Sequence, residues 1–181
     1  MVRKILDGLY LGAGWAAGLF LIIIFLLMMG LSVGRQIGAN VPAGDDFVAW
    51  SMVAMGFLAL AHTFRSGEII RMGLIIDRLR GPLRRAFELF SLMAGLALAG
   101  YFAWHATRMA LDSWKFNELA QGAVALPLWI PQAAYALGLI ILTIAMLDEL
   151  VHVIRGGWPH YAKEPPKTRE EVLERAAAGN L

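Results

Sequence analysis

The chain has 181 residues, of which 59% are hydrophobic and 17% are charged, and its formal net charge is +2 at pH 7. Soluble domains carry about 25% charged residues, so this composition argues against an ordinary soluble protein and favours an integral membrane protein. The absence of cysteine excludes disulfides, iron–sulfur clusters, thiolate zinc sites and cysteine nucleophiles.

Four long blocks of the sequence contain no Asp, Glu, Lys, Arg or His. A helix crosses the hydrocarbon of a bilayer with roughly 20 apolar residues, so the shorter blocks must extend into their flanking residues. The blocks therefore predict an all-α integral membrane protein with four transmembrane helices. We place these helices at about residues 12–33, 46–65, 86–106 and 128–151.

The first block resembles a secretory signal because Arg3 and Lys4 precede it. It is longer than the usual apolar region of a signal, and no convincing cleavage site follows it, so we interpret it as a retained first helix. Three pairs of glycines spaced by four residues favour close approach of a neighbouring helix. These pairs are Gly8 and Gly12, Gly14 and Gly18, and Gly30 and Gly34.

The loop over residues 35–46 contains Gly38, Pro42 and Gly44, and it leads into the second helix. Asp45 or Asp46 is predicted to cap that helix, because a carboxylate accepts hydrogen bonds from the free N–H groups of a first turn.

Between the second and third helices, four apolar residues recur at helical spacing on the side opposite Arg71 and Arg78. This pattern predicts a short interfacial helix, with its apolar stripe at the headgroup boundary and its arginines beside anionic lipid. The four residues are Ile69, Met72, Ile76 and Leu79.

The third helix is rich in alanine, which favours one face packed against another helix. A polar outer loop, long enough for a short helix lying on the membrane, is predicted over residues 108–121, and the fourth helix then begins near Pro127 and Pro131. The alanines are Ala94, Ala97, Ala99 and Ala103.

Four helices place the N-terminus, the connection between helices two and three and the C-terminal tail on one side of the membrane. That side carries thirteen of the sixteen Lys and Arg residues, and the other side carries Arg35, Arg108 and Lys115. The positive-inside rule therefore predicts that both termini are cytoplasmic. The chain divides into a membrane domain, residues 1–155, and a polar cytoplasmic tail, residues 156–181, with either a short helix at 169–178 or a frayed, solvated end.

Tryptophans near the ends of the predicted spans are typical membrane-interface anchors. They are Trp15, Trp50, Trp104, Trp129 and Trp158.

The four apolar cores contain no ionisable residue, whereas a transporter that moves an ion by itself usually needs polar groups at the midplane. The sequence therefore favours a helper of another membrane protein over a complete permease. A haem-binding redox subunit is an alternative, because paired histidines on neighbouring helices can ligate haem iron. His62 and His152 fall near the predicted cytoplasmic boundary and His105 near the outer one, so only the first two could share a metal.

Residues 63–85 resemble the signature that follows the second helix in the small membrane subunit of TRAP transporters, the DctQ-like family of the tripartite ATP-independent periplasmic uptake systems. Ile69 stands where that family usually has histidine, and Gly73 stands where it usually has an acidic residue. Residues 126–131, followed by Leu137 and Gly138, are similar to the proline-tryptophan-proline start of the family's fourth helix. The matching signature positions are Arg65, Gly67, Ile70, Arg71, Asp77, Arg78, Leu79 and Pro82.

The resemblance implies a non-catalytic subunit of the bacterial inner membrane that widens the fixed scaffold of a large elevator-type subunit. The large subunit would hold the sodium and substrate sites, no cofactor is expected in this chain, and a periplasmic binding protein would deliver an organic acid, often a carboxylate. The outer loops are then the expected docking surface for the binding protein. The charged residues of this expected docking surface are Arg35, Asp45, Asp46, Lys115 and Glu118.

The signature segment is the expected contact with the large subunit or with lipid. Arg65, Glu68 and Arg71 are spaced by three, so they could form an ion-pair set or, equally, a solvated face held by lipid phosphate. The contact residues are Arg65, Gly67, Glu68, Arg71, Asp77 and Arg78. A small channel or permease that acts alone is the third alternative.

Overall fold

The structure is a computed structural model that describes residues 2–39, 41–66, 82–122 and 124–156. These residues form four helices and no strand, and all four helices are long and apolar enough to cross a membrane. The predicted all-α fold with four membrane-spanning helices is therefore confirmed. The helices are α1 (Val2–Gln36), α2 (Gly44–Ser66), α3 (Pro82–Lys115) and α4 (Trp129–Ile154).

Helix α3 continues well past the end of its uncharged block. It runs to Lys115, so the outer loop predicted over residues 108–121 is wrong for residues 108–115. Charges such as Arg108 and Asp112 end an apolar block but do not end a helix, and no Gly or Pro interrupts this stretch.

The residues predicted to start α2 do not lie where they were expected, whereas the proline predicted at the start of α4 does. Asp45 and Asp46 lie in the first turn of α2 instead of at its cap, because the turn through Ala43, at φ 60°, starts the helix at Gly44. Their charges are still favourable there, since the N-terminus of a helix carries partial positive charge. Pro131 lies in the first turn of α4, where its missing N–H costs little.

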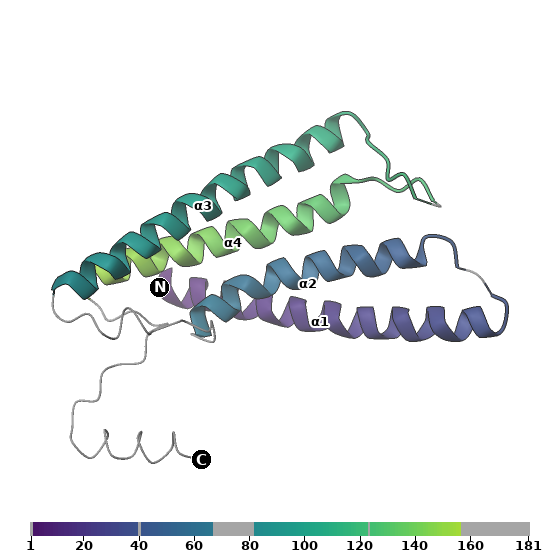
Figure 1. Cartoon of the computed structure of the whole chain (residues 1–181), viewed down its shortest axis with the longest axis horizontal. Coiled ribbons are helices and arrows are strands. Elements are labelled where there is room, and N and C mark those ends of the chain that lie inside the picture. Colours follow the sequence, from purple (N-terminus) through teal and green to yellow (C-terminus); the bar gives the residue numbers. More distant parts are fainter. Residues whose placement is uncertain (1, 40, 67–81, 123, 157–181) are drawn as a thin grey trace, which may run out of the picture.

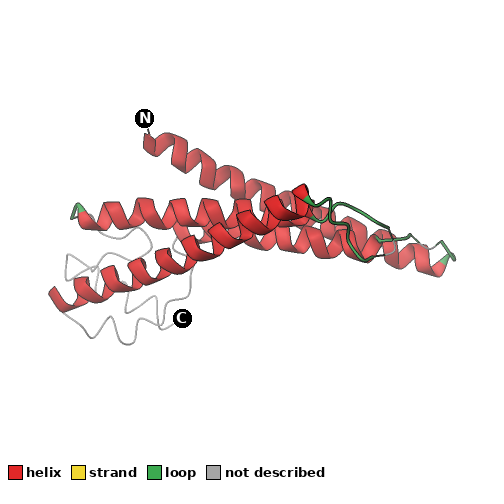
Figure 2. Ribbon diagram, turned by 90° about the horizontal axis from the view of Figure 1, so that it is seen from above, coloured by secondary structure: helices red, strands yellow, loops and turns green. Residues whose placement is uncertain are grey.

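The four helices form an open row in the order α3, α4, α2, α1 (Figure 1). Each helix packs mainly on its neighbours in this row, and the described residues of α1 and α3 make no contact with each other. The α1–α2 and α3–α4 connections lie toward the same end of the molecule, while the N-terminus lies toward the other end (Figure 2). The two hairpins spread apart toward their connecting loops (Figure 1).

The two hairpins meet where α4 crosses α2 at Gly138. A Cβ atom added there would lie 2.5 Å from the backbone carbonyl carbon of Phe57, so only glycine allows this approach. The Phe57 ring also packs edge-on against Tyr135, with ring centroids 4.3 Å apart. This contact fixes the centre of the row.

The small residues predicted to pack divide into two groups. Ala99 and Ala103 are buried, but Ala94 and Ala97 are exposed, because only Ala99 and Ala103 lie on the side of α3 that faces α4.

Among the paired glycines, Gly14 abuts His62 and Gly34 lies close to the Ala39 carbonyl oxygen. The other four, Gly8, Gly12, Gly18 and Gly30, have no neighbour within 4 Å of an added Cβ among the described residues.

Some predicted segments lie outside the described residues. They are the interfacial helix at 69–79 and the terminal helix at 169–178.

Candidate functional site

Ionisable side chains are confined to the helix ends in the part of the chain that the structure describes. Every Asp, Glu, Lys and Arg in α1 to α4 lies within eight residues of an end of its helix. The middles of the four helices are therefore uncharged, and the charged contacts form two groups, one at each end of the row.

The buried group is the Arg65 cluster, which consists of Arg65, Asp7, Asp148 and Glu149. Arg65 Nη2 lies 3.2 Å from Asp7 Oδ1, and Arg65 Nη1 lies 3.4 Å from Asp148 Oδ2 and 3.5 Å from Glu149 Oε2. The four residues come from α1, α2 and α4, so a single guanidinium joins three helices.

Burial differs strongly among the members of the Arg65 cluster. The Glu149 side chain is 2% exposed and that of Arg65 is 19% exposed, whereas that of Asp7 is 52% exposed. The Arg65 guanidinium carbon also lies 6.0 Å from the centre of the Tyr10 ring, and Tyr10 is itself buried. A charge held this deeply needs its opposite partners, because leaving one unpaired costs about 3–5 kcal/mol.

The cluster follows from the lengths of the uncharged blocks. Arg65 is the first Lys or Arg after the block in α2, Asp7 precedes the block in α1, and Asp148 follows the block in α4. Helices α2 and α4 run in the same direction and α1 runs opposite to them, so the end of α2, the end of α4 and the start of α1 lie at one end of the row (Figure 1). Arg65 also lies in the last turn of α2, where a cation is favoured by the helix dipole.

The cluster can hold three helices in one register. The described residues contain no group of three or more His, Cys, Asp or Glu residues that could hold a metal ion.

Sequence reasoning identified Arg65 but missed its three acidic partners and Tyr10. The signal was present in the acidic residues beside the uncharged blocks at the same end as Arg65. Of the other predicted contact residues, the structure describes none: Gly67, Glu68, Arg71, Asp77 and Arg78 lie outside the described residues.

The opposite end carries the residues predicted to dock a binding protein. Arg35 donates two hydrogen bonds to the carboxylate of Asp45, at 3.0 Å and 3.1 Å, and both side chains are exposed. Asp46 lies directly against Gly122, and Glu118 accepts a hydrogen bond of 2.6 Å from the Ser113 hydroxyl.

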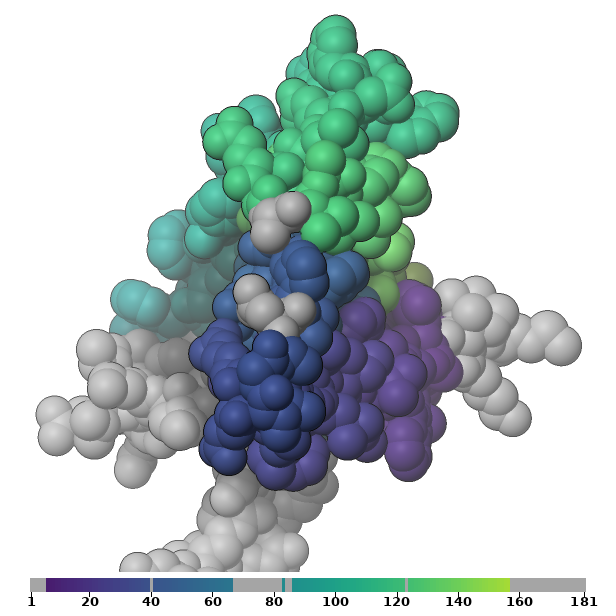
Figure 3. Space-filling model, turned by 90° about the vertical axis from the view of Figure 1, so that its right-hand side faces the viewer, coloured from purple at the N-terminus to yellow at the C-terminus, as the bar shows by residue number. Residues whose placement is uncertain are grey.

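The structure thus gathers these predicted residues at the end that carries the connecting loops, with Lys115 as the last residue of α3. Figure 3 looks onto this end, where the α3–α4 loop in green lies beside the start of α2 in blue. An open hollow of about 680 Å³ lies between them. It is lined by Asp46, Glu118, Leu119, Ala120, Gln121, Gly122 and Leu128.

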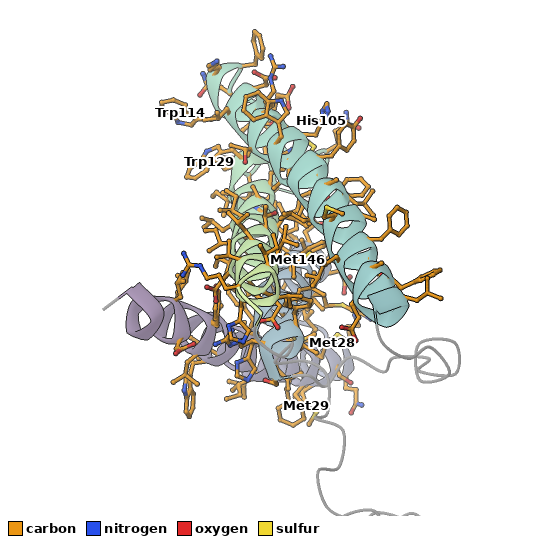
Figure 4. The ribbon with its side chains drawn as sticks, turned by 90° about the vertical axis from the view of Figure 1, so that its left-hand side faces the viewer. Met28, Met29, His105, Trp114, Trp129 and Met146 are labelled. Carbon is orange, nitrogen blue, oxygen red and sulfur yellow. The ribbon has the colours of Figure 1, made fainter. Side chains whose placement is uncertain are left out.

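Four of the five predicted tryptophan anchors are described. Trp15 and Trp104 are strongly exposed, whereas Trp50 and Trp129 are more sheltered. Trp114, a further tryptophan near the end of α3, lies on the same side of α3 and α4 as Trp129 (Figure 4). Trp158 lies outside the described residues.

The histidines are on different elements. His62 of α2 packs against Gly14 of α1, and His152 lies in the last turn of α4. His105 lies on the side of α3 that faces away from α4 (Figure 4), with its ring centroid 4.4 Å from that of Tyr101.

The comparisons with known proteins agree with the fold. A family model described as tripartite ATP-independent periplasmic transporters, DctQ component, matches residues 15–156, which is well over half of the chain. No curated protein matches the sequence.

Proposed function

The chain belongs to the DctQ component family of tripartite ATP-independent periplasmic transporters, and from this membership we propose that it is a non-catalytic scaffold subunit. In this role it braces a large elevator-type subunit that carries out sodium-driven uptake of an organic acid, a carboxylate. A periplasmic binding protein delivers that acid. Sodium binds to the large subunit, and this chain needs no cofactor of its own.

One observation carries the proposal: the helices form an open row with uncharged middles and broad exposed apolar faces. In α1 the exposed side chains include Trp15, Leu19, Ile22 and Leu26. A subunit that moved an ion itself would need polar groups and broken helices near the midplane. An uncharged row with free apolar faces is suited to lie against a larger membrane protein.

The Arg65 cluster supports this role because a scaffold must not deform when its moving partner pulls on it. Ion pairs from one buried arginine to three acidic residues tie α1, α2 and α4 together at one end. The signature residues that follow Arg65 are the proposed contact with the large subunit or with lipid.

The charge distribution supports an orientation in the inner membrane of a bacterium. The end with the Arg65 cluster is the proposed cytoplasmic side, because thirteen of the sixteen Lys and Arg residues fall on that side. The end with the connecting loops is then periplasmic, so Arg35, Asp45 and Asp46, together with Lys115 and Glu118, are the proposed docking surface for the binding protein.

Reconstitution in liposomes tests the proposal. We expect solute accumulation under a sodium gradient only when this chain, the large subunit and the binding protein are all present. Accumulation by the large subunit and binding protein without this chain would contradict the scaffold role. Accumulation by this chain alone would show instead that it is a small permease.

A further inference from the structure

Helix α3 carries an arginine that has no acidic partner among the described residues, although it lies in a membrane-spanning helix. Arg108 is seven residues before the end of α3, which is about 10 Å along the helix axis. Its guanidinium carbon lies 6.0 Å from the centre of the Trp104 ring, and Trp104 is 64% exposed. Arg108 follows the apolar span predicted at about residues 86–106, so its guanidinium lies close to the headgroup layer, where lipid phosphates are available as anionic partners.

The same tryptophan lines a groove between α3 and α4. It has a volume of about 280 Å³ and lies on the outer surface of the helix pair. The groove is lined by Gly100, Ala103, Trp104, Thr107, Ile140, Thr143 and Ile144.

The groove is apolar despite its two threonines. The Thr107 hydroxyl donates to the Ala103 carbonyl oxygen at 2.7 Å, and the Thr143 hydroxyl donates to the Leu139 carbonyl oxygen at 2.8 Å. Both hydroxyls are thus satisfied within their own helices, so the groove has no unmet need for a polar ligand.

Gly100 opens this groove but is not required for helix packing. An added Cβ atom would lie 3.8 Å from Thr143 Cγ2, which is ordinary van der Waals contact. At Gly138, by contrast, the added Cβ would collide with backbone.

We propose that Arg108, Trp104 and the groove below them form a binding site for one anionic phospholipid. The lipid phosphate pairs with the Arg108 guanidinium, and one acyl chain lies in the groove along Gly100 and Thr143. The lipid comes from the leaflet on the side of the connecting loops, because Arg108 is nearer to that end than the groove is. In such a lipid the phosphate lies toward the membrane surface, as Arg108 does, and the acyl chain lies deeper, as the groove does.

The alternative occupant is a carboxylate on a helix of another subunit. The groove favours lipid because its lining is largely apolar and its last α3 residue, Thr107, directly precedes Arg108, so an acyl chain in the groove would begin beside a phosphate paired with Arg108. The arginine side chain can also extend toward the headgroups while its stem stays in the apolar layer.

The test uses the full chain in detergent and 1-palmitoyl-2-oleoyl-phosphatidylglycerol as the probe, with native mass spectrometry to count bound lipid. We expect one lipid to be retained by the wild type, and the affinity of Arg108→Gln to fall about fivefold, as expected for one arginine beside an anionic lipid. Arg35→Gln is the matched control, because this exposed arginine already pairs with Asp45, and it should bind as the wild type does. Equal retention by Arg108→Gln and the control would overturn the site.

A second pair of variants tests the groove separately. Gly100→Leu should lose the retained lipid because its side chain fills the groove, whereas Gly100→Ala should keep most of it. Circular dichroism identifies any variant that has lost its helices. A dibrominated form of the same lipid should quench a fluorescence component that is missing in Trp104→Phe. The proposal would be overturned if folded Gly100→Leu retained the lipid, or if the quenching were unchanged in Trp104→Phe. Displacement of the lipid by millimolar inorganic phosphate would also overturn it.

Discussion

Both ends of the helix row use contacts between arginine and acidic residues, but these contacts differ in what they join. At one end, Arg65 is 19% exposed and links three helices that are distant in sequence. At the other end, Arg35 and Asp45 are 64% and 78% exposed and link two helices that are already joined by a short loop. The same chemistry therefore fixes the fold at one end and adds little at the other.

This difference explains the shape of the molecule. The hairpins are tied at the Arg65 cluster and cross at Gly138, beyond which their helices spread apart, while the α3–α4 loop reaches back to α2 where Gly122 lies against Asp46 (Figure 1). A scaffold built in this way has a rigid end and an open end. The variants below test that contrast, beginning with the largest expected effect.

Removal of the central cation should have the largest effect. We expect Arg65→Ala to lower the free energy of unfolding by about 3–5 kcal/mol, because Glu149 is left in a buried position without this partner. SDS titration in mixed micelles, followed by circular dichroism, measures this change. Asp7→Asn should cost much less than Glu149→Gln, since Asp7 is half exposed. If both variants lost the same free energy of unfolding, the burial of Glu149 would not explain the importance of its ion pair.

The crossing of the hairpins should be the next most sensitive position. Gly138→Ala places a methyl group against the Phe57 backbone, so we expect a loss of about 1–3 kcal/mol in the free energy of unfolding. Gly100→Ala is a matched control, because its added methyl group makes only ordinary contact with Thr143. The same SDS titration should separate the two variants. Similar losses would show that the crossing at Gly138 is not as tight as described.

The helices were predictable from sequence because an uncharged block of sufficient length has few alternatives to a membrane span. Their ends were less predictable. Arg108 and Asp112 interrupt the apolar pattern of α3 but lie on a continuous helix, so charge alone gave a boundary that was too early. Ala94 and Ala97 were grouped with Ala99 because the direction of the neighbouring helix was unknown.

The candidate site was predictable only in part. Arg65 could be recognised because it closely follows an uncharged block and matches a family signature. Its partners are 58, 83 and 84 residues away along the chain, so identifying them requires the order of the helices in the row. That order depends on contacts such as Gly138 with Phe57, which no local pattern specifies.

The exposed pair at the open end should contribute little. We expect Arg35→Gln and Asp45→Asn each to change the free energy of unfolding by less than about 1 kcal/mol, because both side chains are strongly exposed. The small loss should shrink further in high salt, which screens exposed charges. A loss comparable to that of Arg65→Ala would remove the contrast between the two ends. If this surface docks the binding protein, these variants should instead weaken that binding in a salt-dependent manner.

The smallest change in stability is expected inside the rigid end. The Tyr10 hydroxyl is buried and has no hydrogen-bond partner among the described residues, although its ring packs beneath Arg65. Removing an unsatisfied buried hydroxyl while keeping the ring should leave the free energy of unfolding unchanged or slightly higher. We therefore expect Tyr10→Phe to match or exceed the wild type in the SDS titration, while Tyr10→Ala, which also removes the ring, loses about 3–5 kcal/mol. A large loss in Tyr10→Phe would mean that the hydroxyl binds a partner in the membrane-embedded protein, and the rigidity of this end would then depend on that partner as well as on Arg65.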